Sequence, residues 1–171
     1  MLLEQGEAPG VRGATAAGMG HITVNAADEA SIQLCILGRK IWREDAPPSS
    51  EEDGFVEIGT LWMAEDDASL ADLGLAASRL NEAGVAADLL EGSSLFEVEP
   101  ALARDLRGGL RLPEDGAIYA PTAAASMVGE AVQIGATIRT SVKVLAVERG
   151  QVLLDDGTSI SADAIVIASG L

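Results

Sequence analysis

The sequence has few of the residues on which disulfide frameworks, metal sites and aromatic cores depend. Its 171 residues include one cysteine, one histidine and only 3% aromatic residues. The lone Cys35 excludes an internal disulfide, and one cysteine with one histidine provides no zinc-ligand spacing. No Gly-Xaa-Ser-Xaa-Gly motif is present, so a hydrolase of that type is not expected either. We therefore predict no metal site.

Basic residues are also scarce, with 11 Lys and Arg against 27 Asp and Glu and a net charge of −16. Repulsion between this charge and a phosphate backbone or an anionic bilayer opposes binding, so no nucleic acid partner is expected. No apolar run approaches the ~18 residues that a spanning helix needs, and no secretory leader opens the chain. These absences predict no membrane span and a cytoplasmic protein.

Hydrophobic residues nevertheless make up 48% of the chain, so Ala, Val, Leu and Ile must build its core. Three segments have the periodicity of helices, namely 28–43, 67–83 and 122–134. Asp28 can cap the first helix, and Gly84 and Gly135 follow the other two as stop signals.

Other segments predict strands. Residues 55–64 alternate and predict one strand or two short ones, and 110–120 predict two strands around a turn. Residues 142–154 predict a hairpin, while 164–167 are wholly apolar, as in a buried parallel strand. Leu2 and Leu3 look like the end of another strand, 6–20 a loop, and 46–53 a turn-rich break. The predicted fold is mixed, α/β or α+β, with two sheet systems.

Four features could carry chemistry. Glu4 follows the first strand, where dinucleotide-binding folds place an acid that binds the adenosine ribose, although an exposed glutamate is an alternative. The small residues of 12–20 let the backbone approach a flat ring or a phosphate, although most such loops are turns. His21 could carry a proton or cap a loop. Tyr119 could face a substrate or fill a packing position.

Taken in order, the segments of the chain resemble FAD-dependent amine oxidoreductases of the D-amino-acid oxidase, glycine oxidase and sarcosine oxidase type. The similarity lies in 95–102, 108–121, 135–138 and 163–170, including Asp115-Gly116 between two prolines. It implies a partial FAD-binding Rossmann-like domain with part of an antiparallel-sheet substrate domain. Residues 1–45 and 122–171 would belong to the FAD-binding region, and 46–121 to the substrate domain.

The resemblance also implies which residues bind FAD. Glu4 and Gln5 would bind the ribose, and the backbone of Val144 would contact the adenine. The loop that wraps the pyrophosphate and passes the flavin would contain Arg12, Gly13, Ala14, Thr15, Ala17, Gly18 and Met19. Ala168, Ser169 and Gly170 would turn closely past the pyrophosphate. His21 would lie near the flavin or the substrate, and Tyr119 is the other catalytic candidate.

The family reaction would transfer a hydride from the carbon bearing the amine to flavin N5, giving an imine that hydrolyses. An amine or a D-amino or imino acid is the expected substrate, and the acceptor, oxygen or another, stays open. The sequence has no Gly-Xaa-Gly-Xaa-Xaa-Gly turn, and the resemblance covers only the interior of the family pattern. The alternative is therefore a truncated, non-catalytic chain or interaction subunit, whose fold another chain could complete.

Overall fold

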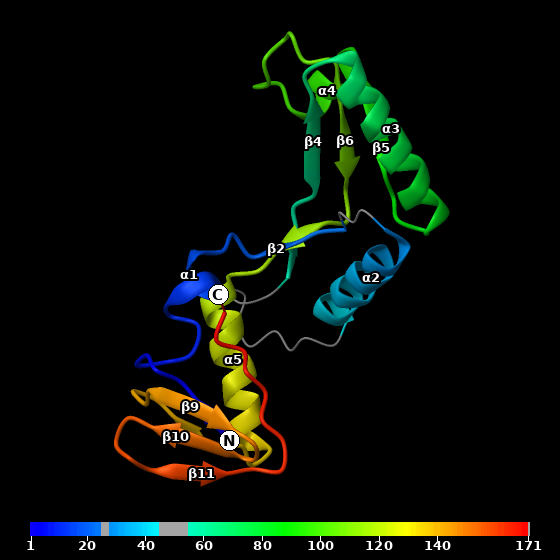
Figure 1. The fold of residues 1–171 in the computed structure, drawn as a ribbon. Coiled ribbons are helices and arrows are strands. Elements are labelled where there is room, and N and C mark those ends of the chain that lie inside the picture. Colours follow the sequence, from blue (N-terminus) through cyan, green and yellow to red (C-terminus); the bar gives the residue numbers. More distant parts are fainter. Residues whose placement is uncertain (25–27, 45–54, 171) are drawn as a thin grey trace. The chain divides into compact units, whose positions relative to one another are not determined.

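The computed structural model describes residues 1–24, 28–44 and 55–170, which fall into two compact units (Figure 1). The terminal unit contains residues 1–20 and 119–170, and the central unit contains 21–24, 28–44 and 55–118. The sequence analysis divided the chain by role, with boundaries after residues 45 and 121, and these compact units do not test that division. The cofactor and substrate roles given to those segments stay predictions.

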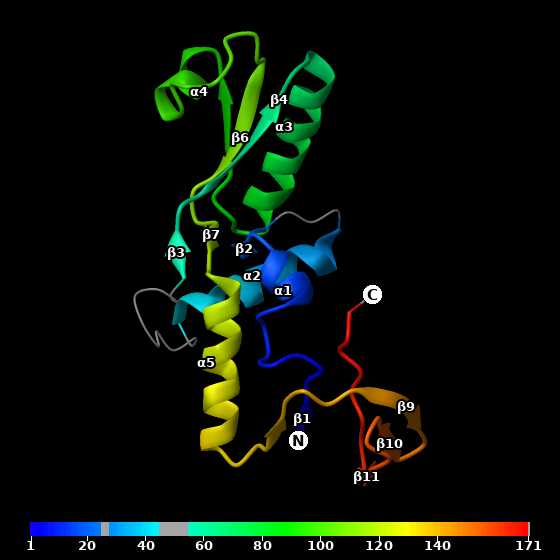
Figure 2. The ribbon, with the colours of Figure 1, turned by 90° about the vertical axis from the view of Figure 1, so that its left-hand side faces the viewer.

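The terminal unit combines two small sheets with two helices (Figure 2). Its elements are β1 (Leu2–Leu3), α1 (Gly13–Ala17), α5 (Ala120–Gln133), β8 (Ile138–Arg139), β9 (Val144–Glu148), β10 (Gln151–Leu154) and β11 (Ser159–Ser161). Strand β1 pairs with β8 in parallel, and the antiparallel sheet has the order β11-β10-β9.

Local sequence explains the main boundaries of this unit. Pro121 lies in the first turn of α5, where its missing N–H costs no helical hydrogen bond. Gly135 follows the helix with a φ of +101°, a conformation that favours glycine. Gly150 turns β9 into β10 with a φ of +77°, and the hairpin buries Val152 and Leu154. The predicted helix and hairpin are therefore present.

The central unit has two antiparallel sheets and three helices. Its elements are β2 (His21–Ile22), α2 (Glu29–Glu44), β3 (Val56–Glu57), β4 (Thr60–Ala64), α3 (Asp67–Glu82), β5 (Asp88–Glu91), α4 (Ser93–Val98), β6 (Gly108–Leu112) and β7 (Gly116–Ala117). The sheet orders are β2-β7-β3 and β4-β6-β5. Residues 55–64 thus form two strands, because Gly59 lies between them with a φ of +73°.

Aliphatic residues form the core of the central unit, as expected from so few aromatic residues. Its buried members come from α2, α3, β6 and the adjoining loops, and they are Val24, Ile32, Ala77, Leu80, Val85, Ala87, Leu110 and Leu112. Helix α3 packs on β4, β5 and β6. A capping box of Asp66 and Ser69 begins α3, and Gly84 follows it with a φ of +83°.

Two predictions were wrong. The loop predicted for 6–20 contains the short helix α1. Residues 164–167 form no buried strand, and the side chains of Val166 and Ile167 are 88% and 69% exposed. A parallel strand needs a neighbour for its hydrogen bonds, and in the described part of the chain β1 pairs with β8 alone.

The predicted turn-rich break at 46–53 lies outside the described residues. Within the ranges that the structure describes, no helix has the length and apolarity required to cross a membrane.

Candidate functional site

Glu4 lies directly after β1 and is held by its backbone and its side chain. Its amide donates to the Arg139 carbonyl oxygen at 2.9 Å, and its own carbonyl accepts from the Val142 amide at 3.0 Å. Its Oε1 accepts a hydrogen bond from the Gly6 amide at 2.6 Å. The half-buried acid therefore sits beside the segment that leads from β8 into β9.

Val144 is the first residue of β9, two residues after Val142, whose amide bonds to Glu4. The Ser141 amide donates to the Gly6 carbonyl at 2.8 Å, so residues 141–142 run along the chain that follows β1. Val144 itself is partly exposed and pairs with Leu154 of β10. The structure thus links the two elements that carry the predicted ribose and adenine residues. Gln5, also predicted to bind cofactor, is exposed.

The predicted pyrophosphate loop forms α1 and its flanks, and all seven of its predicted residues are exposed. They are Arg12, Gly13, Ala14, Thr15, Ala17, Gly18 and Met19. The loop contacts α5 at Gly10, where a Cβ would come within 2.6 Å of the Ala124 Cβ. Gly18 closes α1, since its amide donates to the Ala14 carbonyl at 2.8 Å. The backbone of the segment is therefore ordered against α5 and open on its outer side.

Ala168, Ser169 and Gly170 do not join a sheet. They are exposed and belong to the irregular chain that follows β11. The resemblance implied that these three residues lie at the end of a parallel sheet. The structure does not place them there, because the preceding residues form no strand.

The two catalytic candidates fall in different units. His21 is exposed and begins β2 of the central unit, where its backbone pairs with Ala117. Tyr119 is 62% exposed in the terminal unit, where its carbonyl accepts a hydrogen bond from Thr122 Oγ1 at 2.9 Å. Tyr119 is therefore more exposed than the half-buried packing residue of the alternative, and both catalytic roles stay predictions.

Sequence reasoning missed a buried ion pair in the central unit. Arg39 of α2 is 6% exposed and Asp115 is fully buried. Arg39 Nη1 lies 3.4 Å from Asp115 Oδ1, and its Nη2 lies 2.7 Å from Glu114 Oε2. Arg39 follows Ile32 by seven residues, which places it on the buried face of the helix and could have predicted its burial.

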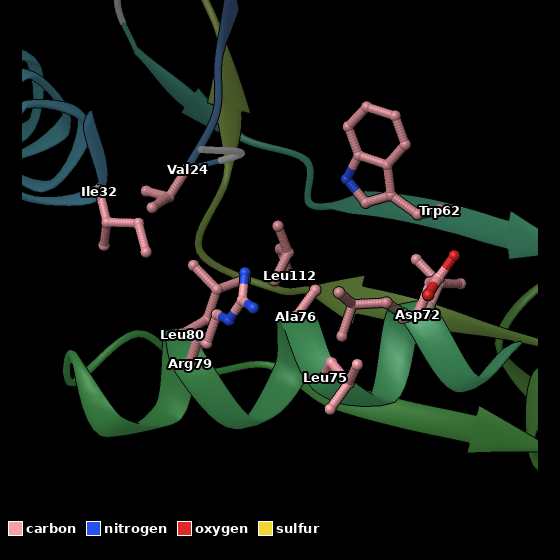
Figure 3. Close-up of a pocket in the computed structure, with 11 residues that line it drawn as sticks. Val24, Ile32, Trp62, Asp72, Leu75, Ala76, Arg79, Leu80 and Leu112 are labelled. Carbon is pink, nitrogen blue, oxygen red and sulfur yellow. The ribbon is translucent and has the colours of Figure 1, made fainter. Parts of the chain in front are cut away.

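The central unit also contains a cavity of about 330 Å³ beside α3 (Figure 3). Its walls are mainly apolar and include Val24, Ile32, Leu80 and Leu112, with Trp62 of β4 opposite α3. Asp72 and Arg79 of α3 are its charged lining residues. None of the predicted cofactor residues lines this cavity.

Hydrogen bonding lowers the pKa of three exposed aspartates. The Ser31 amide and hydroxyl lower the pKa of Asp28, and the Ser69 hydroxyl and amide lower that of Asp66. Thr158 lowers the pKa of Asp156, with a smaller contribution from Arg139. These groups cap helices or turns, so their shifts belong to local structure.

The chain matches a family model over its whole length and individual proteins over most of it. Residues 1–171 match the DAO family of FAD dependent oxidoreductases. The chain is 31% identical to the glycine oxidase of Geobacillus kaustophilus over 121 residues, which are 68% of this chain and 32% of that enzyme. It is 26% identical over 155 residues to the mouse mitochondrial pyruvate dehydrogenase phosphatase regulatory subunit, covering 89% of this chain and 17% of that subunit.

The crystal structure of glycine oxidase from Geobacillus kaustophilus superposes with a TM-score of 0.85 and 26% identity. The match covers 98% of this chain and 48% of that structure. The mixed α/β fold therefore corresponds to part of the glycine oxidase fold, and the chain spans less than half the length of these relatives. Because the family model matches residues 1–171, this chain belongs to the DAO family of FAD-dependent oxidoreductases.

Proposed function

We propose that the chain supplies part of the FAD site of an oxidoreductase that oxidises an amine or a D-amino or imino acid. The observation that carries this proposal is the position of Glu4. The residue directly follows β1, which pairs in parallel with β8, and its carbonyl accepts a hydrogen bond from Val142, two residues before Val144. An acid at this end of a strand is where dinucleotide-binding folds bind the ribose.

The residues of the terminal unit fit the adenosine part of FAD. Ribose hydroxyls donate hydrogen bonds, and a carboxylate accepts several of them, so the Glu4 carboxylate retains acceptor capacity beyond its bond to Gly6. Val144 has an extended backbone and a small side chain that leaves its peptide groups approachable. These features support the roles given to both residues.

The fit is weaker toward the pyrophosphate. The outer side of 12–19 is exposed, as a phosphate-contacting loop requires. Residues 168–170, however, lie outside any sheet in this structure. The proposal for them therefore requires that a strand at 164–167 form against a neighbouring strand.

Bound FAD would supply a two-electron acceptor for the hydride on the carbon that bears the amine. The work of this chain would be to hold and orient the cofactor, since positioning accounts for much of the rate in such reactions. Amino-acid substrates are supported by the relatives named glycine oxidase. The glycine-rich loop would then border the reacting end of the cofactor.

The test is to purify the chain, add excess FAD, remove unbound cofactor and record the visible absorption spectrum. Flavin bands near one equivalent would support the proposal, and an assay of D-amino and imino acids with oxygen or an artificial electron acceptor would follow. A folded but colourless protein would show that this chain alone does not form the site.

A second candidate is a non-catalytic interaction subunit. One observation favours it, because a relative that matches 89% of this chain is named a regulatory subunit of a phosphatase. This function predicts a folded, flavin-free chain that forms a stable complex with another protein. Light scattering after size-exclusion chromatography, with and without FAD, distinguishes the two candidates.

A further inference from the structure

Asp115 connects three segments of the central unit that are distant in sequence. Its Oδ1 accepts hydrogen bonds from the Val24 amide at 3.1 Å and from Arg39 Nη1 at 3.4 Å. Its backbone carbonyl accepts from the Gly59 amide at 2.8 Å. One buried residue, Asp115, therefore joins the segment after β2, helix α2 and the turn between β3 and β4.

Arg39 supplies the positive charge that compensates the buried Asp115 carboxylate. Asp115 Oδ2 is fully enclosed and accepts no hydrogen bond from the residues that the structure describes. A buried carboxylate in this state is stable only beside an opposite charge. The planar guanidinium meets this need because it reaches both Asp115 and the partly exposed Glu114.

Strand β2 depends on this arrangement because its own ladder is short. It lies at the edge of the β2-β7-β3 sheet and pairs with β7 only through His21 with Ala117 and Ile22 with Gly116. A pairing of this length is marginal in water. The bond from the Val24 amide to the Asp115 side chain continues the attachment of this segment beyond the ladder.

We propose that the buried Arg39–Asp115 pair positions β2 and thereby fixes His21. The pair would act through backbone attachment, so both are positioning residues and neither touches the reacting atoms. A consequence for FAD rests on the function proposed above, because His21 directly follows the glycine-rich loop 12–20. The effect on His21 itself does not depend on that function.

The single histidine makes the test direct, since one imidazole signal in a proton–nitrogen or proton–carbon NMR spectrum reports on His21 alone. The variants are Arg39→Met, Asp115→Asn and Arg39→Lys. Lys40→Met is the matched control, because Lys40 is the next residue of α2 and is exposed in a weak 3.7 Å pair with Glu44. FAD affinity of each variant is measured in parallel by fluorescence titration.

We expect Arg39→Met and Asp115→Asn to shift or split the His21 signal by more than its linewidth while far-UV circular dichroism is retained. Arg39→Lys should give a His21 signal closer to that of the wild type. Its ammonium group keeps the positive charge but lacks the planar guanidinium that reaches both Asp115 and Glu114. Lys40→Met should leave it unchanged. FAD affinity should fall about tenfold in the first two variants, the equivalent of one hydrogen bond to a charged group.

An unchanged His21 signal in folded Arg39→Met and Asp115→Asn would overturn the inference. If these variants do not fold, the double variant Arg39→Met/Asp115→Leu replaces the pair by apolar groups and still removes the acceptor of the Val24 amide. Its His21 signal must then differ from the wild type. Absence of FAD binding in the wild-type chain would refute the proposed function, whereas the His21 signal would still decide the positioning role.

Discussion

The Val142 amide donates a hydrogen bond to the Glu4 carbonyl oxygen over 3.0 Å and brings together two residues from opposite ends of the sequence. Together with the parallel pairing of β1 and β8, this bond fixes the position of the Glu4 backbone, from which its carboxylate side chain extends. The second half of the chain thus holds the acidic residue of the first in place beside the start of β9.

Glu4→Gln tests the ribose contact. The amide keeps the shape of the side chain but offers one acceptor oxygen and no charge, so FAD affinity should fall about tenfold. The measurement is a fluorescence titration of the chain with FAD. Glu7→Gln, at an exposed position of the same segment, is the control and should bind like the wild type. Equal loss in both variants would indicate a general charge effect.

Arg39→Met should lower the free energy of unfolding by about 3–5 kcal/mol, because it leaves the Asp115 carboxylate buried without its counter-charge. Urea denaturation followed by Trp fluorescence measures the change. Arg39→Met/Asp115→Leu should recover most of the loss, since no uncompensated charge is left. A single variant as stable as the wild type would mean that the pair contributes nothing to folding.

Gly116→Ala should destabilise the central unit by about 1–3 kcal/mol through overpacking. A Cβ at this position of β7 would press on the Val56 carbonyl oxygen and reach within 2.5 Å of the Phe55 ring. Gly129→Ala in α5 is the opposite case, because no atom lies within 4 Å of its added Cβ. That substitution should stabilise by about 0.5–1 kcal/mol through helix propensity. Thermal unfolding of both variants checks whether the melting temperature falls in Gly116→Ala and rises in Gly129→Ala.

Acid should weaken the start of α3 through Asp66. Hydrogen bonds from the Ser69 hydroxyl and amide lower the pKa of this carboxyl below its ordinary value of 3.8. Its contribution is therefore fully present above the unfolded-state pKa and is lost as the pH falls through the folded-state pKa.

Asp66→Asn should reduce the difference in melting temperature between pH 7 and pH 3, measured by circular dichroism. Asp72→Asn, later in the same helix, should leave that difference nearly intact. An undiminished difference in Asp66→Asn would assign the acid sensitivity to other groups.

The helices were predictable because their signals are local. Asp28 accepts from the Ser31 amide at 3.0 Å, as its position before the apolar stripe indicated, and Gly84 and Gly135 end helices with positive φ. The turn at 114–116 and the hairpin at Gly150 have similarly local causes.

The features that sequence reasoning missed depend on distant partners. Residues 164–167 have the composition of a buried strand, but no neighbour pairs with them in the described chain. The spacing of Arg39 from Ile32 could have predicted its burial, but not its carboxylate partner, which lies 76 positions away. In the predicted cofactor site, the strand before Glu4 was recognisable from the sequence, whereas the bond that links Glu4 to Val142 was not.

The pairing of Leu2 with Ile138 also bears on the order of folding. The central unit is nearly continuous in sequence, so its contacts close shorter loops and can form while the rest of the chain is still being synthesised. Strand β1 is synthesised before the central unit and its partner β8 after it. The segment that carries Glu4 is therefore expected to assemble after the central unit, and halting translation before residue 138 would leave Glu4 without its neighbours.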